Sequence, residues 1–275
     1  MTALDSTPHA STADGATATP HQRGCPVSFA LERTAGLLAF AYGLVCYAAF
    51  LVTFLYAIGF VGNWLVPKSI DSGTPGPALR SMAINAALLV IFVVQHTIMA
   101  RAWFKRRIVR ILPAALERST FVLLASASLM TIFAFWQPLP QTVWRVEQPI
   151  VAGALVAISL AGWLFVPLSS FAINHFDLFG LRQTWLCLRG RGYHPVGFRL
   201  VGPYRLVRHP LMLGFIVAFW ATPHMSLGHL FFAVMTTGYI LFGIWIEERG
   251  LLAEHGEAYE SYRRQVRALV PLPRG

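Results

Sequence analysis

Charged side chains are scarce in this chain. Only 12% of its 275 residues are Asp, Glu, Lys or Arg, whereas 56% are hydrophobic, and the mean hydropathy is +0.56. A water-soluble domain carries roughly twice that charged fraction. The composition therefore excludes an ordinary soluble domain and predicts a protein embedded in a membrane.

Cysteine is also scarce, and its spacing forms no motif. Cys25, Cys46 and Cys187 include no C-x-x-C pair, so neither a disulfide framework nor a zinc site is expected. The nine histidines raise the alternative of a membrane metal oxidase. H-x-x-x-H and H-x-x-H-H boxes are missing, however, and the nearest pair, His224 and His229, is five residues apart. We therefore predict no metal site.

Lysine and acidic side chains are few, so arginine dominates the net charge of +10. Such a balance is typical of nucleic-acid-binding proteins. Here the basic residues flank apolar segments and do not line one face of a domain. We therefore expect a membrane-lipid surface as the partner, and no nucleic acid.

Long apolar segments set the fold class. A bilayer core of about 30 Å needs roughly 20 apolar residues in a helix, and a 13-residue helix rises only about 20 Å. The short fifth segment and the sixth therefore predict a helical hairpin, and the sequence leaves open whether its first arm crosses fully. The sequence predicts an all-α, polytopic membrane protein with five to six transmembrane helices, over residues 35–61, 80–100, 119–137, 150–171, 210–222 and 226–247.

The basic residues predict the orientation. All but three of the 22, namely Lys68, Arg80 and Arg145, fall on the side that holds both termini. By the positive-inside rule that side is cytoplasmic. Residues 101–110 alternate apolar and basic side chains, which is typical of an interfacial helix.

The chain is predicted to have three parts. Residues 1–28 are rich in Ser, Thr, Ala, Pro and Gly and lack the apolar core of a signal peptide, so they are predicted to be a disordered cytoplasmic tail. Residues 29–171 form a four-helix transmembrane region. Residues 172–275 comprise a cytoplasmic cap, the helical hairpin and a C-terminal region.

Ionisable side chains at the ends of the hairpin mark a candidate site, because such groups are costly at a membrane boundary. Arg208-His209-Pro210 begins its first arm, and Glu247-Glu248 is expected to close its second. Proline suits a first helical turn, and helix N-termini favour anions. A ligand with both a carboxylate and a cationic centre fits these groups. The alternative is that Arg208 is a membrane anchor paired with one of the glutamates.

The run GPYRLVRHPLMLG, followed by IEERGLLAEHGEAYESYRRQVRALVP, resembles the isoprenylcysteine carboxyl methyltransferases and phospholipid N-methyltransferases over residues 202–271. Gln95-His96 and NHFDLFGLRQ at 174–183 extend the resemblance to the methanethiol S-methyltransferase group, near the NnrU-like membrane proteins. The resemblance implies a bacterial inner-membrane enzyme with S-adenosylmethionine as methyl donor and last residues that fold back over it. Met212 departs from the tyrosine of many relatives. The resemblance assigns the donor site to Tyr204, Arg208, His209, Pro210, Gly214, Glu247, Glu248, Tyr259 and Tyr262.

A thiol acceptor must lose its proton, because the thiolate is the nucleophile. A neutral His175 is the first candidate base, with Asp177 to pass the proton on. His96 is a second candidate. Asn174, Arg182 and Gln183 are expected to line the mouth of the site with them. Prenylcysteine or phospholipid acceptors, and a non-enzymatic NnrU-like accessory role, remain alternatives to a small thiol. The sequence predicts no oligomeric state.

Overall fold

The computed structural model describes residues 29–195 and 200–271, so the predicted tail of residues 1–28 lies outside the described part. Within that part, five helices are long and apolar enough to cross a membrane. The predicted all-α, polytopic fold is therefore confirmed. These helices are α1 (Phe29–Gly62), α2 (Ala78–Ala100), α4 (Ala114–Phe135), α5 (Pro149–Ile173) and α9 (Leu227–Gln265).

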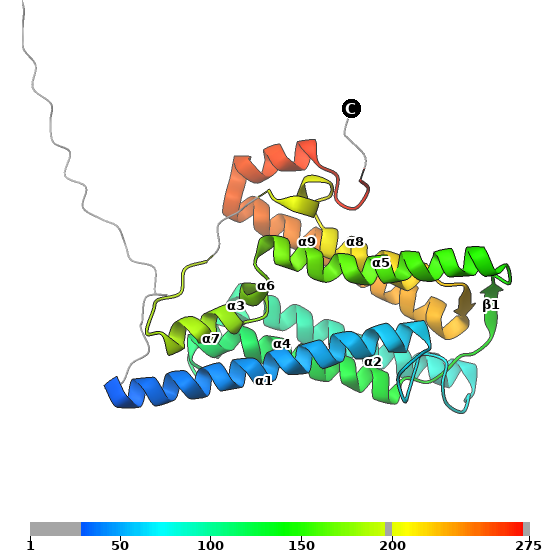
Figure 1. The fold of residues 1–275 in the computed structure, drawn as a ribbon, viewed down its shortest axis with the longest axis horizontal. Coiled ribbons are helices and arrows are strands. Elements are labelled where there is room, and N and C mark those ends of the chain that lie inside the picture. Colours follow the sequence, from blue (N-terminus) through cyan, green and yellow to red (C-terminus); the bar gives the residue numbers. More distant parts are fainter. Residues whose placement is uncertain (1–28, 196–199, 272–275) are drawn as a thin grey trace, which may run out of the picture.

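The helices form two layers (Figure 1). In one layer α1 and α2 pack against α4, and in the other α5 and α9 pack against the short helix α8 (Pro210–Trp220). Aromatic side chains fill the space between the layers. Phe54 of α1 meets Trp163 of α5 edge to face at 5.5 Å, and Phe60 meets Phe232 of α9 at 6.2 Å. Such close packing holds membrane helices together, since lipid tails are themselves apolar.

Short elements cover the two ends of the bundle. The end where α1 begins and α5 finishes, here called the site end, carries α3 (Ala102–Ile108), α6 (His175–Leu178), α7 (Leu181–Leu188) and the 3₁₀ turn η1 (Gly202–Arg205). The helix predicted over residues 101–110 is confirmed as α3. The opposite end, the strand end, carries β1 (Thr142–Arg145) and β2 (His224–Ser226).

Helix α8 is too short to span a bilayer, which answers the question that the sequence left open. Its 11 residues rise about 16 Å. Beyond it β2 pairs antiparallel with β1, with Thr142 opposite Ser226 and Arg145 opposite His224. The sequence did not predict this small sheet, which satisfies backbone groups that a short membrane helix leaves without partners.

Helix α9 is longer than predicted. The expectation that Glu247 and Glu248 close it is wrong, because the helix continues to Gln265. Leucine, alanine and glutamate between residues 251 and 254 favour helix, and the first break comes at Gly256. There φ is 51° and ψ is −125°, so the last part of the helix turns back over the site end.

Two glycines let α5 and α8 approach closely. A Cβ atom on Gly214 would lie 2.8 Å from the backbone oxygen of Gly162 and 2.9 Å from a methyl carbon of Val166. Small residues permit such close contact between membrane helices. This contact holds the start of α8 against α5.

Candidate active site

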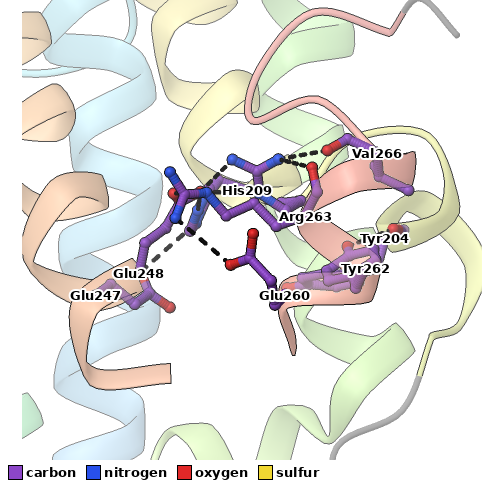
Figure 2. A network of polar contacts seen from close by, with 9 residues as sticks. Tyr204, His209, Glu247, Glu248, Glu260, Tyr262, Arg263 and Val266 are labelled. Carbon is purple, nitrogen blue, oxygen red and sulfur yellow. Dashed lines mark hydrogen bonds and ion pairs between the residues drawn. The ribbon is translucent and has the colours of Figure 1, made fainter. Parts of the chain in front are cut away.

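Three segments form an ionic cluster at the site end (Figure 2). Arg208 and His209 directly precede α8, Glu247 and Glu248 lie on α9, and residues 266–268 follow α9. The structure therefore brings together the groups that the sequence placed on the two arms of the hairpin. The continuation of α9 beyond the glutamates adds the third segment.

Arg208 is the centre of this cluster. Its side chain is 4% exposed, and its Nε donates to Oε1 of Glu248 at 2.8 Å. One terminal nitrogen donates to the backbone oxygen of Arg263 at 3.2 Å and to that of Val266. The ion pair that the sequence offered as an alternative role for Arg208 is thus present. Because the guanidinium also binds two backbone carbonyls, it fixes the chain that follows α9.

His209 connects the two glutamates. Its Nε2 lies 3.2 Å from Oε1 of Glu248, and its Nδ1 lies 3.6 Å from Oε2 of Glu247. The Glu248 side chain is 15% exposed, whereas that of Glu247 is 49% exposed. Glu247 therefore presents a carboxylate to the surroundings, while Glu248 is largely enclosed next to Arg208 and His209.

The chain after α9 folds back onto the start of α8. The backbone N–H of Arg208 donates to the oxygen of Arg267 at 2.9 Å, and that of His209 donates to the oxygen of Ala268 at 3.1 Å. These two bonds attach residues 267 and 268 to the start of α8. Pro210 follows at the first turn of α8, where a missing N–H costs nothing.

The predicted tyrosines are part of the same region. Tyr259 is 1% exposed and Tyr262 is 5% exposed, and their rings lie 5.9 Å apart. The hydroxyl of Tyr262 donates to the backbone oxygen of Tyr204 at 2.6 Å (Figure 2). Burial, and then the charge of Glu247, raise the pKa of Tyr204. Tyr262 therefore attaches the end of α9 to η1, and both rings are buried within the protein.

The second predicted group forms a separate polar network around α6. Arg182 donates to Oδ1 of Asp177 at 2.8 Å, and the hydroxyl of Tyr193 donates to Oδ2 at 3.2 Å. The side chain of Asn174 caps α6 by accepting from the backbone N–H of Asp177, and Gln183 donates to the backbone oxygen of Asp177. This network joins α6 to α7.

His175 belongs to a different environment. Its ring is 4% exposed, stacks on Phe171 at 4.0 Å, and lies within 2.7 Å of both the hydroxyl of Tyr47 and that of Ser170. Burial lowers its pKa, which favours the neutral ring that a base requires. The sequence interpretation missed Tyr47 and Ser170. The signal that could have identified Tyr47 is its hydroxyl group within an apolar transmembrane span.

His96 lies on α2 and contacts α9. Its Nδ1 is 2.8 Å from the hydroxyl of Tyr239, and its ring contacts Phe92 and Phe121. Among the described residues, neither His96 nor His175 hydrogen-bonds to the ionic cluster. The structure thus places the two candidate bases apart from each other and from Arg208.

The described residues contain no group of three or more His, Cys, Asp or Glu side chains arranged to hold a metal ion. Fold and site therefore define a multi-pass membrane protein with a buried ionic cluster at one end of its bundle.

Comparison with known proteins gives the family. Methanethiol S-methyltransferase of Mycobacterium tuberculosis is 50% identical over 236 residues, which cover 86% of this chain and 97% of that protein. Methanethiol S-methyltransferase of Crocosphaera subtropica is 46% identical over 88% of this chain and 93% of its own length. Nurim of Xenopus laevis is 26% identical over 73% of this chain and 77% of its own length.

No protein-family model matches the chain, and no solved structure matches it significantly. The identity to the enzymes is high and covers most of both chains. The chain belongs to the methanethiol S-methyltransferase family, as the sequence resemblance indicated, and is a methyltransferase.

Proposed function

We propose that this chain transfers a methyl group from S-adenosylmethionine to methanethiol and releases dimethyl sulfide at the cytoplasmic face of a bacterial inner membrane. The observation that carries the proposal is the cluster of Arg208, His209, Glu247 and Glu248 in a chain 50% identical to an enzyme named for methanethiol. The basic residues of the site end support the cytoplasmic orientation.

The residues present fit the methyl donor. Glu247 offers a half-exposed carboxylate next to His209, and a carboxylate is a suitable partner for a cationic amine or sulfonium. His209 is the N-cap of α8 and makes no side-chain capping bond there, so N–H groups of the first turn face an incoming carboxylate. Glu247, His209 and the first turn of α8 would hold the donor, with Tyr204 beside them.

The other residues of the cluster maintain the structure of this site and limit the access of water to it. Arg208 and Glu248 neutralise each other, and Arg208 holds the chain after α9 over the start of α8. When bound, S-adenosylmethionine supplies a methyl group that is already activated for transfer. The main task of the protein is therefore to align the acceptor and to remove its proton. We assign the proton to His175, whose ring is buried and neutral.

Calorimetric titration of S-adenosylmethionine into detergent-purified protein tests the donor site. Wild type is expected to bind, and His209→Ala is expected to lose at least tenfold in affinity because the imidazole and its contact to Glu247 disappear. His194→Ala, on the exposed loop after α7, is the matched control and should bind like wild type. Equal heats for wild type and His209→Ala would remove this donor site. Absence of binding to wild type would favour a non-enzymatic accessory role.

Headspace gas chromatography tests the acceptor. Purified protein with S-adenosylmethionine and methanethiol should release dimethyl sulfide. Turnover of a prenylcysteine or of phosphatidylethanolamine, with none of methanethiol, would reassign the acceptor.

A further inference from the structure

A cavity of about 240 Å³ lies between α1 and α5, next to His175. We call it the α1–α5 cavity. Its walls are almost entirely apolar and include Phe50, Leu51 and Val166, while Tyr47, Ser170 and His175 bring polar atoms to one side. Val166 also contacts α8 at Gly214, one turn beyond Pro210. Val166 therefore borders both the cavity and α8.

The hydrogen bonds around His175 favour one tautomer. The hydroxyl of Ser170 lies 2.8 Å from the backbone oxygen of Pro167, to which it can donate its one hydrogen. In that arrangement Ser170 accepts from Nδ1 of His175, so Nδ1 carries the hydrogen and Nε2 is bare. Nε2 accepts in turn from the hydroxyl of Tyr47 at 2.7 Å. The oxygen of Tyr47 keeps lone pairs that can accept a proton from a molecule in the cavity.

We propose that the α1–α5 cavity is the acceptor subsite and that Tyr47 relays the acceptor's proton to His175. This inference rests on the proposed function. The thiol S–H bond breaks and its proton passes to the oxygen of Tyr47, while the hydroxyl proton of Tyr47 passes to Nε2 of His175. The thiol sulfur keeps the electron pair of the broken bond and uses it to form the bond to the methyl group. The bond between that methyl group and the donor sulfonium breaks, and the donor sulfur keeps its electron pair and leaves as a neutral thioether. The imidazolium later releases its proton to solvent.

The position of the cavity also indicates how the acceptor arrives. Leu51 and Leu55 of α1 and Phe171 of α5 line it and are 39%, 64% and 57% exposed, on helices whose exposed flanks face lipid. A small apolar thiol that partitions into the bilayer reaches the cavity between these side chains. At roughly 30 Å³ per heavy atom, taken from the share of a water molecule, methanethiol fills only part of the volume. The subsite therefore takes short alkyl thiols in general, including ethanethiol and 1-propanethiol.

Tyr47→Phe tests the relay, because it removes one oxygen and keeps the ring contacts. Donor affinity should not change, and kcat at pH 7 should fall about 100-fold, the lower range for loss of acid–base catalysis. The variant then depends on thiol that ionises in solution, so its rate should rise about tenfold per pH unit up to the thiol pKa. Wild type should not show that rise. A rate loss that is the same at every pH would overturn the relay.

Leu51→Trp tests the location, with Val52→Trp as the matched control. Val52 is the next residue of α1, is 60% exposed and does not line the cavity. We expect Leu51→Trp to raise KM for methanethiol at least tenfold and to abolish turnover of 1-propanethiol, with donor affinity unchanged. Val52→Trp should behave like wild type. Equal KM values in all three proteins would overturn the subsite and leave the proposed function intact, whereas an inactive wild type would refute that function itself.

Discussion

Glu248 accepts from Arg208 and His209 within a largely enclosed space, whereas its neighbour Glu247 is half exposed and lies next to His209. Two adjacent carboxylates on one helix thus have different surroundings. The first balances a buried guanidinium and so contributes to folding. Under the proposed function, the second is the group that meets the methyl donor.

Isosteric substitutions should separate these two roles. Glu248→Gln leaves the Arg208 charge buried without its counterion, so we expect a loss of stability on the order of 3 kcal/mol. Glu247→Gln should change stability little and should weaken S-adenosylmethionine binding. Thermal unfolding in detergent and calorimetric titration measure the two effects. Equal destabilisation by both substitutions would contradict this division of roles.

The stability of the protein should also depend on His175. Burial lowers the pKa of its ring in the folded protein, whereas the unfolded chain titrates near 6.5. As the pH falls below about 6.5, the unfolded chain binds a proton that the folded ring takes up less readily, so the free energy of unfolding decreases. His175→Phe should show a smaller decrease between pH 7.5 and 5.5 than wild type. His194→Gln, at an exposed position, should keep the wild-type dependence, and an unchanged slope in His175→Phe would refute the assignment.

The residue types predicted the ionic cluster but not the hydrogen bonds within it. Arg208, His209 and the two glutamates were recognisable because charged groups at membrane boundaries are costly. That Arg208 also binds the carbonyls of Arg263 and Val266 depends on a chain reversal that local sequence does not specify. Donor binding by the nine residues of the predicted site, and catalysis by His175 and His96, stay predictions.

At the scale of the elements, the contact between α5 and α8 leaves little room for a larger side chain. Gly214 meets Gly162 so closely that even one added carbon must displace a backbone. We expect Gly214→Ala to cost about 1–3 kcal/mol, as overpacking usually does. Gly153→Ala, on α5 with open space around it, should be neutral or stabilising by about 0.5–1 kcal/mol. Thermal unfolding of the two variants checks this, and similar melting temperatures would argue against a tight crossing.

The long apolar runs predicted the transmembrane helices because helix is the form in which a membrane segment satisfies its own backbone. The pairing of β1 with β2 was missed, since it joins residues about 80 positions apart. The continuation of α9 was missed because the charged pair at 247–248 resembles a helix end at a membrane surface. Gly256 indicates where the helix can break, but the sequence does not indicate the direction in which the chain then turns.

At the scale of the whole molecule, the structure gathers most of the basic residues at the site end, while Lys68 and Arg145 lie toward the strand end. The positive-inside rule then predicts a cytoplasmic site end. In a cysteine-free background, Val143→Cys on β1 should react with a membrane-impermeant maleimide in intact spheroplasts. Glu257→Cys, exposed just after the kink of α9, should react only after permeabilisation. The reverse pattern would invert the proposed orientation.

The backbone bonds from Arg208 and His209 to Arg267 and Ala268 have a consequence for biosynthesis. Residues 267 and 268 are synthesised after every apolar helix of the chain. The start of α8 can therefore gain these two backbone partners only when nearly the whole chain has left the ribosome, so the ionic cluster is among the last parts of the fold to be completed.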